Sequence, residues 1–125
     1  MKKTITTNEA PAAIGPYSQA VEAGGFVYIS GQIPLIPGTG DLVKGGIKEQ
    51  TRQVLDNIGA ILRAAGLGYQ DVIKCTVYLA DIYHFKDMNE VYGSYFSSEP
   101  PARAAIQVGK LPMGALVEID TVAAR

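Results

Sequence analysis

The apolar positions of the chain recur at helical spacing in two segments. Between residues 47 and 65 they fall on one helix face, at Ile47, Val54, Leu55, Ile58, Ile61, Leu62 and Ala65. Gly66 follows as a natural helix end. We expect a second helix over about residues 83–96, with Asp81 as its N-terminal cap. Its apolar stripe is formed by Phe85, Met88, Tyr92, Tyr95 and Phe96. Both helices are therefore predicted to be amphipathic.

Alternating apolar and polar residues predict strands elsewhere, in segments 2–6, 19–23, 26–30, 72–80, 100–108 and 116–120. In the fourth of these, Ile73, Cys75, Val77 and Leu79 are expected to face one way, opposite Lys74, Thr76 and Tyr78. The dipeptide Gly24-Gly25 suits a tight hairpin turn, and the glycine- and proline-rich segment 31–46 is expected to be a long loop. The predicted class is α+β: a mixed sheet of five to six strands with two helices packed on one face.

Two helices cover only one face of such a sheet. The other face is expected to carry Tyr28 or Ile29, together with Thr76, Tyr78 and Leu116. A face of this composition is too apolar to be left in water. We therefore expect another copy of the chain to cover it.

Composition narrows the function classes. The 125 residues form one predicted domain, 1–125, that is 47% hydrophobic and 18% charged with a net charge of -1. Without a basic stripe no nucleic-acid partner is expected, and without an 18-residue apolar run no membrane partner is expected. The single cysteine excludes a disulfide framework within the chain and agrees with a cytoplasmic location.

An arginine and an acid on two late strands are the leading chemical candidates. If Val108 pairs with Ala115 across the loop between these strands, Arg103 and Glu118 project from one face of a hairpin. A guanidinium fork binds a carboxylate through two hydrogen bonds, and an acid moves protons. This pair therefore suits a small anionic substrate, whereas the alternative is a solvated surface salt bridge.

Other polar residues leave two interpretations each. Asn89 leans toward the apolar stripe of the second helix, where its amide either binds backbone or lines a polar cavity. Tyr17 follows Gly15-Pro16. Its phenol either lies at the edge of a cleft or only packs against neighbouring side chains. His84 and Cys75 are the only residues of their types and lie apart in sequence, so we expect a solvated histidine, a core cysteine and no metal site.

Four motifs together resemble one family. They are Ala10-Pro-Ala-Ala-Ile-Gly-Pro-Tyr17-Ser18, Ser30-Gly31-Gln32-Ile33-Pro34, Asn89-Glu-Val-Tyr92, and Pro101-Ala-Arg103-Ala with Val117-Glu118-Ile119. Nearly end to end, the chain resembles the RidA/YjgF family of enamine/imine deaminases. The resemblance implies a chorismate-mutase-like fold and a homotrimer with clefts between subunits.

The resemblance also implies an activity that needs no cofactor. It is the hydrolysis of 2-aminoacrylate and 2-aminocrotonate, through their imine tautomers, to 2-oxo acids and ammonia. Arg103 is implied to hold the substrate carboxylate and Glu118 to activate water. Tyr17, Gly31 and Asn89 are implied to line or support the cleft.

One departure from the family pattern lies close to the implied arginine. Many members carry Ser-Cys-Val-Glu where this chain has Ala104-Ala105-Ile106-Gln107. Either the thiol is dispensable and only the backbone N–H of Ala105 touches the substrate, or this member differs in activity. Because Arg103 and Glu118 are both present, we expect the first. The alternative function is a small-molecule-binding or regulatory protein that uses the same cleft without turnover.

Overall fold

The computed structural model describes all 125 residues and confirms the predicted order of elements. Three strands come first, β1 (Lys3–Ile5), β2 (Ala20–Ala23) and β3 (Phe26–Gln32). They are followed by α1 (Ile47–Ala64), β4 (Val72–Leu79), α2 (Phe85–Tyr95), β5 (Ala102–Gln107) and β6 (Val117–Ala124). Short 3-10 turns occupy Tyr69–Asp71 (η1), Ile82–His84 (η2) and Pro112–Gly114 (η3).

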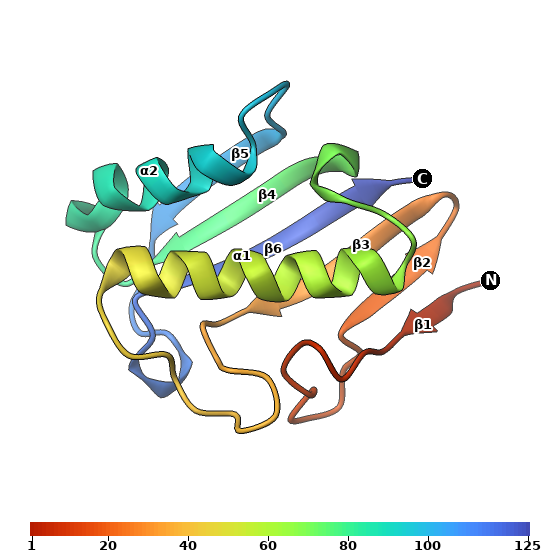
Figure 1. The fold of residues 1–125 in the computed structure, drawn as a ribbon, viewed down its shortest axis with the longest axis horizontal. Coiled ribbons are helices and arrows are strands. Elements are labelled where there is room, and N and C mark those ends of the chain that lie inside the picture. Colours follow the sequence, from red (N-terminus) through yellow and green to blue (C-terminus); the bar gives the residue numbers. More distant parts are fainter.

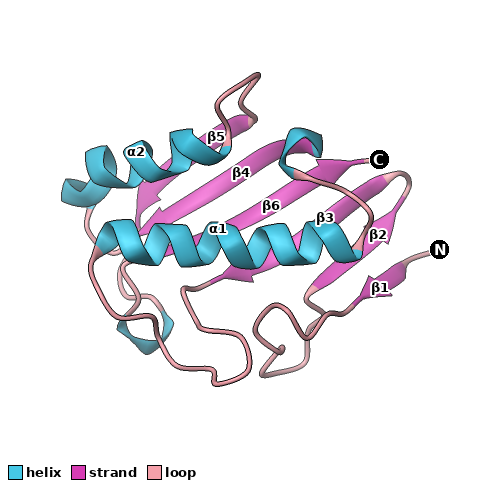
Figure 2. Ribbon diagram, viewed as in Figure 1, coloured by secondary structure: helices cyan, strands magenta, loops and turns pink.

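All six strands belong to one mixed sheet with the order β1-β2-β3-β6-β4-β5. Every neighbouring pair is antiparallel except β4 and β5, which run parallel. Figures 1 and 2, which share one view, show α1 and α2 on the same face of the sheet. Because these are the only two α-helices of the chain, the opposite face carries none. The architecture is therefore the predicted α+β fold. No helix of the chain combines the length and the apolar character needed to cross a bilayer.

The core lies between the sheet and the two helices. Val54, Leu55 and Ile58 of α1 are completely buried, as are Val77 of β4 and Ile119 of β6. Such spacing places one stripe of α1 against the sheet. The stripe predicted for the second helix is also mainly buried, but its first turn is the 3-10 turn η2, which Asp81 caps by accepting a hydrogen bond from the Tyr83 N–H.

The α1 helix has defined ends. The Glu49 carboxylate accepts a hydrogen bond from the Gly46 N–H, 2.9 Å away, at the start of the helix. Gly66, which the sequence predicted to terminate the helix, has a φ of 75°, a conformation that glycine adopts without steric cost. Lys48 also forms an ion pair with Glu90, so the N-terminal turn of α1 is linked to α2.

The predicted hairpin of the last two strands is wrong. β5 pairs only with β4, in a register that places Arg103 beside Cys75, whereas β6 lies between β3 and β4 and places Glu118 beside Tyr78. The β4–α2–β5 unit leaves the inner edge of β4 free, and β6 fills that edge. Glycine and proline composition indicates that the intervening loop turns, but it does not say which strand edge the chain reaches.

Two smaller predictions about sheet faces also need correction. Ile73 is 43% exposed, because the pairing of β4 with β6 shifts between Val72 and Lys74, and Val72 fills the core position instead. Leu116 packs against the core and does not lie on the uncovered face. The alternative between Tyr28 and Ile29 is resolved, since Tyr28 is exposed and Ile29 is buried.

We call the sheet face without helices the open face. Apolar side chains reach solvent on it from three strands: Phe26 and Tyr28 of β3, Val122 of β6, and Ile106 of β5, whose exposed fraction is 47%. The expected apolar character of this face is therefore present.

Candidate active site

The Arg103 side chain lies at the outer edge of the sheet, on the face covered by α2. Phe85, Asn89 and Tyr92 stand at positions i, i+4 and i+7 of that helix, so all three face the arginine. Arg103 Nη1 donates a hydrogen bond of 2.6 Å to Asn89 Oδ1. The guanidinium carbon lies 4.8 Å from the centroid of the Tyr92 ring and 5.5 Å from that of Phe85. We call these four residues the Arg103 corner.

Aromatic rings and one amide fix the guanidinium without neutralising it. Burial raises the pKa of Tyr92, so the ring beside the cation stays a neutral phenol. The two ion pairs of the structure join Lys48 to Glu90 and Arg125 to Glu22, and Arg103 takes part in neither. A guanidinium has five N–H donors, so most of them remain available to an anion.

A hollow of about 370 Å³ opens beside the guanidinium. It is lined by Asn89, Tyr92, Gly93, Phe96, Pro100, Pro101 and Arg103. Of the two alternatives for Asn89, the amide therefore lines a polar cavity, where it also orients the arginine.

Glu118 lies on the open face and belongs to a different hollow, of about 470 Å³. We call this the Glu118 hollow; it is lined by Ile14, Tyr17, Ser30, Gly31, Ile33, Pro112 and Glu118. Gly31 is required by its closeness to the acid, because a Cβ added there would overlap Oε2 and lie 3.0 Å from the carboxyl carbon of Glu118. Tyr17 lines the edge of the hollow with its side chain half exposed.

The surroundings of Glu118 favour a basic carboxylate. Burial raises its pKa, and the nearby negative charge of Asp120 raises it further. No hydrogen bond to the carboxylate opposes these two effects. Its oxygens are therefore free to take a proton from water, and a raised pKa makes a carboxylate a better general base.

Within one chain, the two halves of the predicted site lie apart. Arg103 faces α2 and Glu118 projects from the open face, with β4 between their strands. Tyr17 and Gly31 lie with Glu118, and Asn89 lies with Arg103. Ala105 lines neither hollow, because its side chain packs against the core beside Val77.

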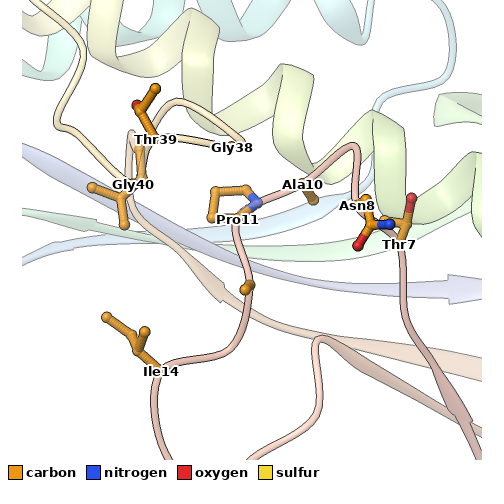
Figure 3. A pocket seen from close by; sticks show the side chains of 10 residues that line it. Thr7, Asn8, Ala10, Pro11, Ile14, Gly38, Thr39 and Gly40 are labelled. Carbon is orange, nitrogen blue, oxygen red and sulfur yellow. The ribbon is translucent and has the colours of Figure 1, made fainter.

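A further hollow lies between the N-terminal segment and the loop after β3. Figure 3 shows Pro11 and Ile14 on one side of it and Gly38, Thr39 and Gly40 on the other. No charged side chain lines this hollow. Its composition does not suit acid–base chemistry.

Phe85 and Tyr92 have a role at Arg103 that the sequence pattern did not predict. Phe85 and Tyr92 were expected only to pack in the apolar stripe of the second helix, yet their rings enclose the guanidinium. The available signal was the spacing of two aromatic residues around Asn89 on one helix face.

The cysteine prediction holds, and no metal-ligand cluster is formed. Cys75 is completely buried, its Sγ lies 3.7 Å from Thr121 Oγ1, and burial raises the pKa of the thiol. No group of three or more His, Cys, Asp or Glu side chains comes together in the chain. The candidate chemistry therefore depends on Arg103 and Glu118.

Comparison with known proteins connects these features to a family. Residues 7–125 match the family described as Endoribonuclease L-PSP. A RutC family protein of Pyrococcus horikoshii is 58% identical over 98% of each chain. The 2-iminobutanoate/2-iminopropanoate deaminase of Homo sapiens is 52% identical over 98% of this chain and 90% of its own. The crystal structure of E. coli TdcF with bound serine is 43% identical, covers 98% of both chains and superposes with a TM-score of 0.94.

Proposed function

Because the chain belongs to the Endoribonuclease L-PSP family, which is also known as the RidA/YjgF family, we propose that it hydrolyses small imines of 2-oxo acids. The substrates are 2-iminopropanoate and 2-iminobutanoate, formed from 2-aminoacrylate and 2-aminocrotonate. The products are 2-oxo acids and ammonia. Three mammalian relatives, which are 52% to 54% identical to this chain over 98% of its length, are named as deaminases of these compounds.

The observation that carries the proposal is that Arg103 and Glu118 each carry a charge with no oppositely charged partner in the chain. Arg103 is half-buried without an acidic partner, and Glu118 is half-buried without a hydrogen-bond donor. Burying a charge that no opposite charge offsets costs free energy, so the two groups point to a ligand that interacts with both. A 2-imino acid has a carboxylate for the arginine and an electrophilic carbon for a water activated by the glutamate.

The steps follow from these roles. Arg103 binds the substrate carboxylate through two parallel N–H donors, which fixes the imine carbon in place. Glu118 takes a proton from water as the water oxygen bonds to that carbon and the C=N double bond becomes single. The protonated Glu118 then returns this proton to the nitrogen, which becomes an amine. Glu118 next takes the remaining hydroxyl proton and passes it to the same nitrogen, so that the C–N bond breaks, ammonia leaves and the carbonyl forms.

The cleft in this proposal is shared between two copies of the chain. Arg103 lies on the edge strand β5, where a second chain can approach, and the Glu118 hollow opens on the face that lacks helices. Packing the β5 edge of one copy against the open face of another covers the exposed apolar side chains and brings Arg103 to Glu118 of the neighbouring copy. Three copies around one axis, each giving and receiving an edge, form the proposed homotrimer with three equivalent clefts.

The proposed ligand is small and anionic. TdcF, whose fold is nearly superposable on this one, was crystallised with serine, a molecule of similar size that also carries a carboxylate. Ribonuclease chemistry has less support here. His84, the only histidine, lines neither hollow, and the surface is not basic.

The deciding experiment is a coupled assay with freshly formed imine. A pyridoxal-phosphate-dependent serine dehydratase generates 2-aminoacrylate, and imine decay is recorded with and without this protein. We expect faster imine loss and stoichiometric pyruvate and ammonia. Decay at the spontaneous rate, combined with calorimetric binding of 2-oxobutanoate, would instead favour the binding protein without turnover.

A further inference from the structure

Tyr78 lies directly beside Glu118 on the open face but does not bond to it. The two residues are cross-strand partners of β4 and β6, so their Cβ atoms are close neighbours. The Tyr78 hydroxyl instead donates a 2.9 Å hydrogen bond to Oδ2 of Asp120, diagonally across the strands. Asp120 follows Glu118 by two residues on β6 and therefore projects from the same face. Two carboxylates and one phenol thus form a compact triangle.

We propose that Tyr78 and Asp120 form a positioning pair for Glu118: the phenol fixes the Asp120 carboxylate, and this fixed negative charge increases the basicity of Glu118 toward water. The inference rests on the proposed function, in which Glu118 is the general base. It adds two residues whose proposed effect on turnover is exerted through Glu118.

The two acids are placed in unequal surroundings. Asp120 receives a hydrogen bond from the phenol, whereas Glu118 receives none. Two neighbouring carboxylates in different environments are pushed toward different proton affinities. The pKa of Glu118 is raised, first by burial and then by the charge of Asp120, so Glu118 takes up a proton more readily than an ordinary glutamate.

The phenol is suited to this task over the pH range in which the enzyme works. The pKa of Tyr78 is raised above its ordinary value, chiefly by the hydrogen bond to Asp120 and also by the charge of Glu118. Tyr78 therefore stays protonated and remains a donor in neutral solution.

Within one chain, no charged group other than Asp120 lies at Glu118. The elements around the acid contribute the uncharged backbone of Gly31 from β3, Pro112 from the η3 turn, and the phenols of Tyr78 and Tyr17. Asp120 is the only charge of the same chain that perturbs Glu118. In the proposed trimer Arg103 of the neighbouring copy also faces Glu118, and Asp120→Asn leaves that arginine in place. The effect of Asp120 is therefore separable by one substitution.

The first test measures Glu118 itself and needs no turnover. Carbon-13 NMR of side-chain carboxyls, assigned with Glu118→Gln, gives the titration midpoint of Glu118 in the intact oligomer. We expect Asp120→Asn, which keeps the shape and an oxygen acceptor for Tyr78, to move that midpoint to lower pH. Tyr78→Phe releases the Asp120 carboxylate and is expected to produce a smaller shift in the same direction. Tyr28→Phe removes another phenol from the open face and is expected to leave the midpoint unchanged.

The second test records turnover against pH in the same variants. The acid limb of kcat/KM is expected to move to lower pH with the midpoint of Glu118, and kcat at neutral pH is expected to fall in Asp120→Asn by less than in Glu118→Gln. An unchanged Glu118 midpoint in Asp120→Asn overturns the inference, even where activity falls, since that combination reports a structural role only. A shifted midpoint in a protein without turnover upholds the pair and rejects the proposed function instead.

Discussion

The Arg103 corner and the Glu118 hollow differ in how their charged groups are held. The arginine is fixed by an amide at 2.6 Å and by two aromatic rings, so the anion-binding group is rigid before any ligand arrives. The glutamate lacks any donor and is constrained by burial and by the absence of a side chain at Gly31. The residue that binds is held firmly, and the residue that moves protons keeps its oxygens free.

The two regions also differ in which side of the sheet they use. The corner belongs to the helix-covered face, and the hollow belongs to the open face. Each contains half of the chemistry that imine hydrolysis requires. On this account a single chain is an incomplete enzyme, and assembly completes the cleft.

The largest effect is expected on the Glu118 side of the comparison. Glu118→Gln keeps the size of the side chain but removes its ability to take a proton. Turnover is expected to fall by about 10²–10⁴-fold, while the affinity for 2-oxobutanoate measured by calorimetry stays close to that of the wild type. Equal losses of affinity and turnover would instead assign Glu118 a binding role.

Gly31→Ala tests whether the glutamate must be placed accurately. The added Cβ overlaps the Glu118 carboxylate, so the acid has to move. A displacement of this kind is expected to lower kcat by about 10²-fold without unfolding the protein. Gly109→Ala is the matched control, because a Cβ there meets no atom within 4 Å and Gly109 lines neither hollow. Wild-type kcat in the Gly31 variant would remove the positional requirement.

Arg103→Lys tests the rigid half. Lysine keeps the charge but loses the planar fork and the stacking on Tyr92. Loss of a charge-assisted interaction of about 1.5–3 kcal/mol predicts a fall in kcat/KM of about ten- to a hundred-fold. Steady-state kinetics in the coupled assay measure this change in kcat/KM. A folded variant with unchanged kcat/KM would reject the carboxylate-binding role.

The smallest effect is expected at Cys75, which lies beneath the corner. The thiol is buried and its pKa is raised, so it is not a nucleophile. Cys75→Ala is expected to cost about 1 kcal/mol in the free energy of unfolding, measured with urea, and to leave kcat unchanged. A large loss of kcat in the folded variant would mean that the chemistry of the corner had been misassigned.

The sequence predicted the elements better than their neighbours in the sheet. Helical spacing identified α1 and α2, and residue type identified Arg103 and Glu118 as chemical candidates. The pairing of β5 was missed because strand alternation gives the face within a strand and not the partner strand. The separation of the anion-binding Arg103 from the proton-transferring Glu118 follows from that pairing. The sequence therefore did not predict this separation either.

Local irregularities account for the remaining differences. Ile73 fits the alternating pattern, but a shift in the pairing of β4 with β6 turns it to solvent. The hydrogen bond from Tyr78 to Asp120 joins residues 42 positions apart, and only the register of two strands brings them together. Such contacts depend on tertiary structure.

The most direct test of the shared cleft is complementation between two weakened chains. Arg103→Lys and Glu118→Gln chains are co-expressed with different tags, and mixed oligomers carrying both tags are purified. Each homo-oligomer is expected to be impaired, whereas every mixed trimer pairs an intact arginine with an intact glutamate in one of its three clefts, roughly a third of the total. The account predicts turnover in the mixture near that fraction of wild type. Turnover no higher than the average of the two parent variants would contradict a cleft shared between chains.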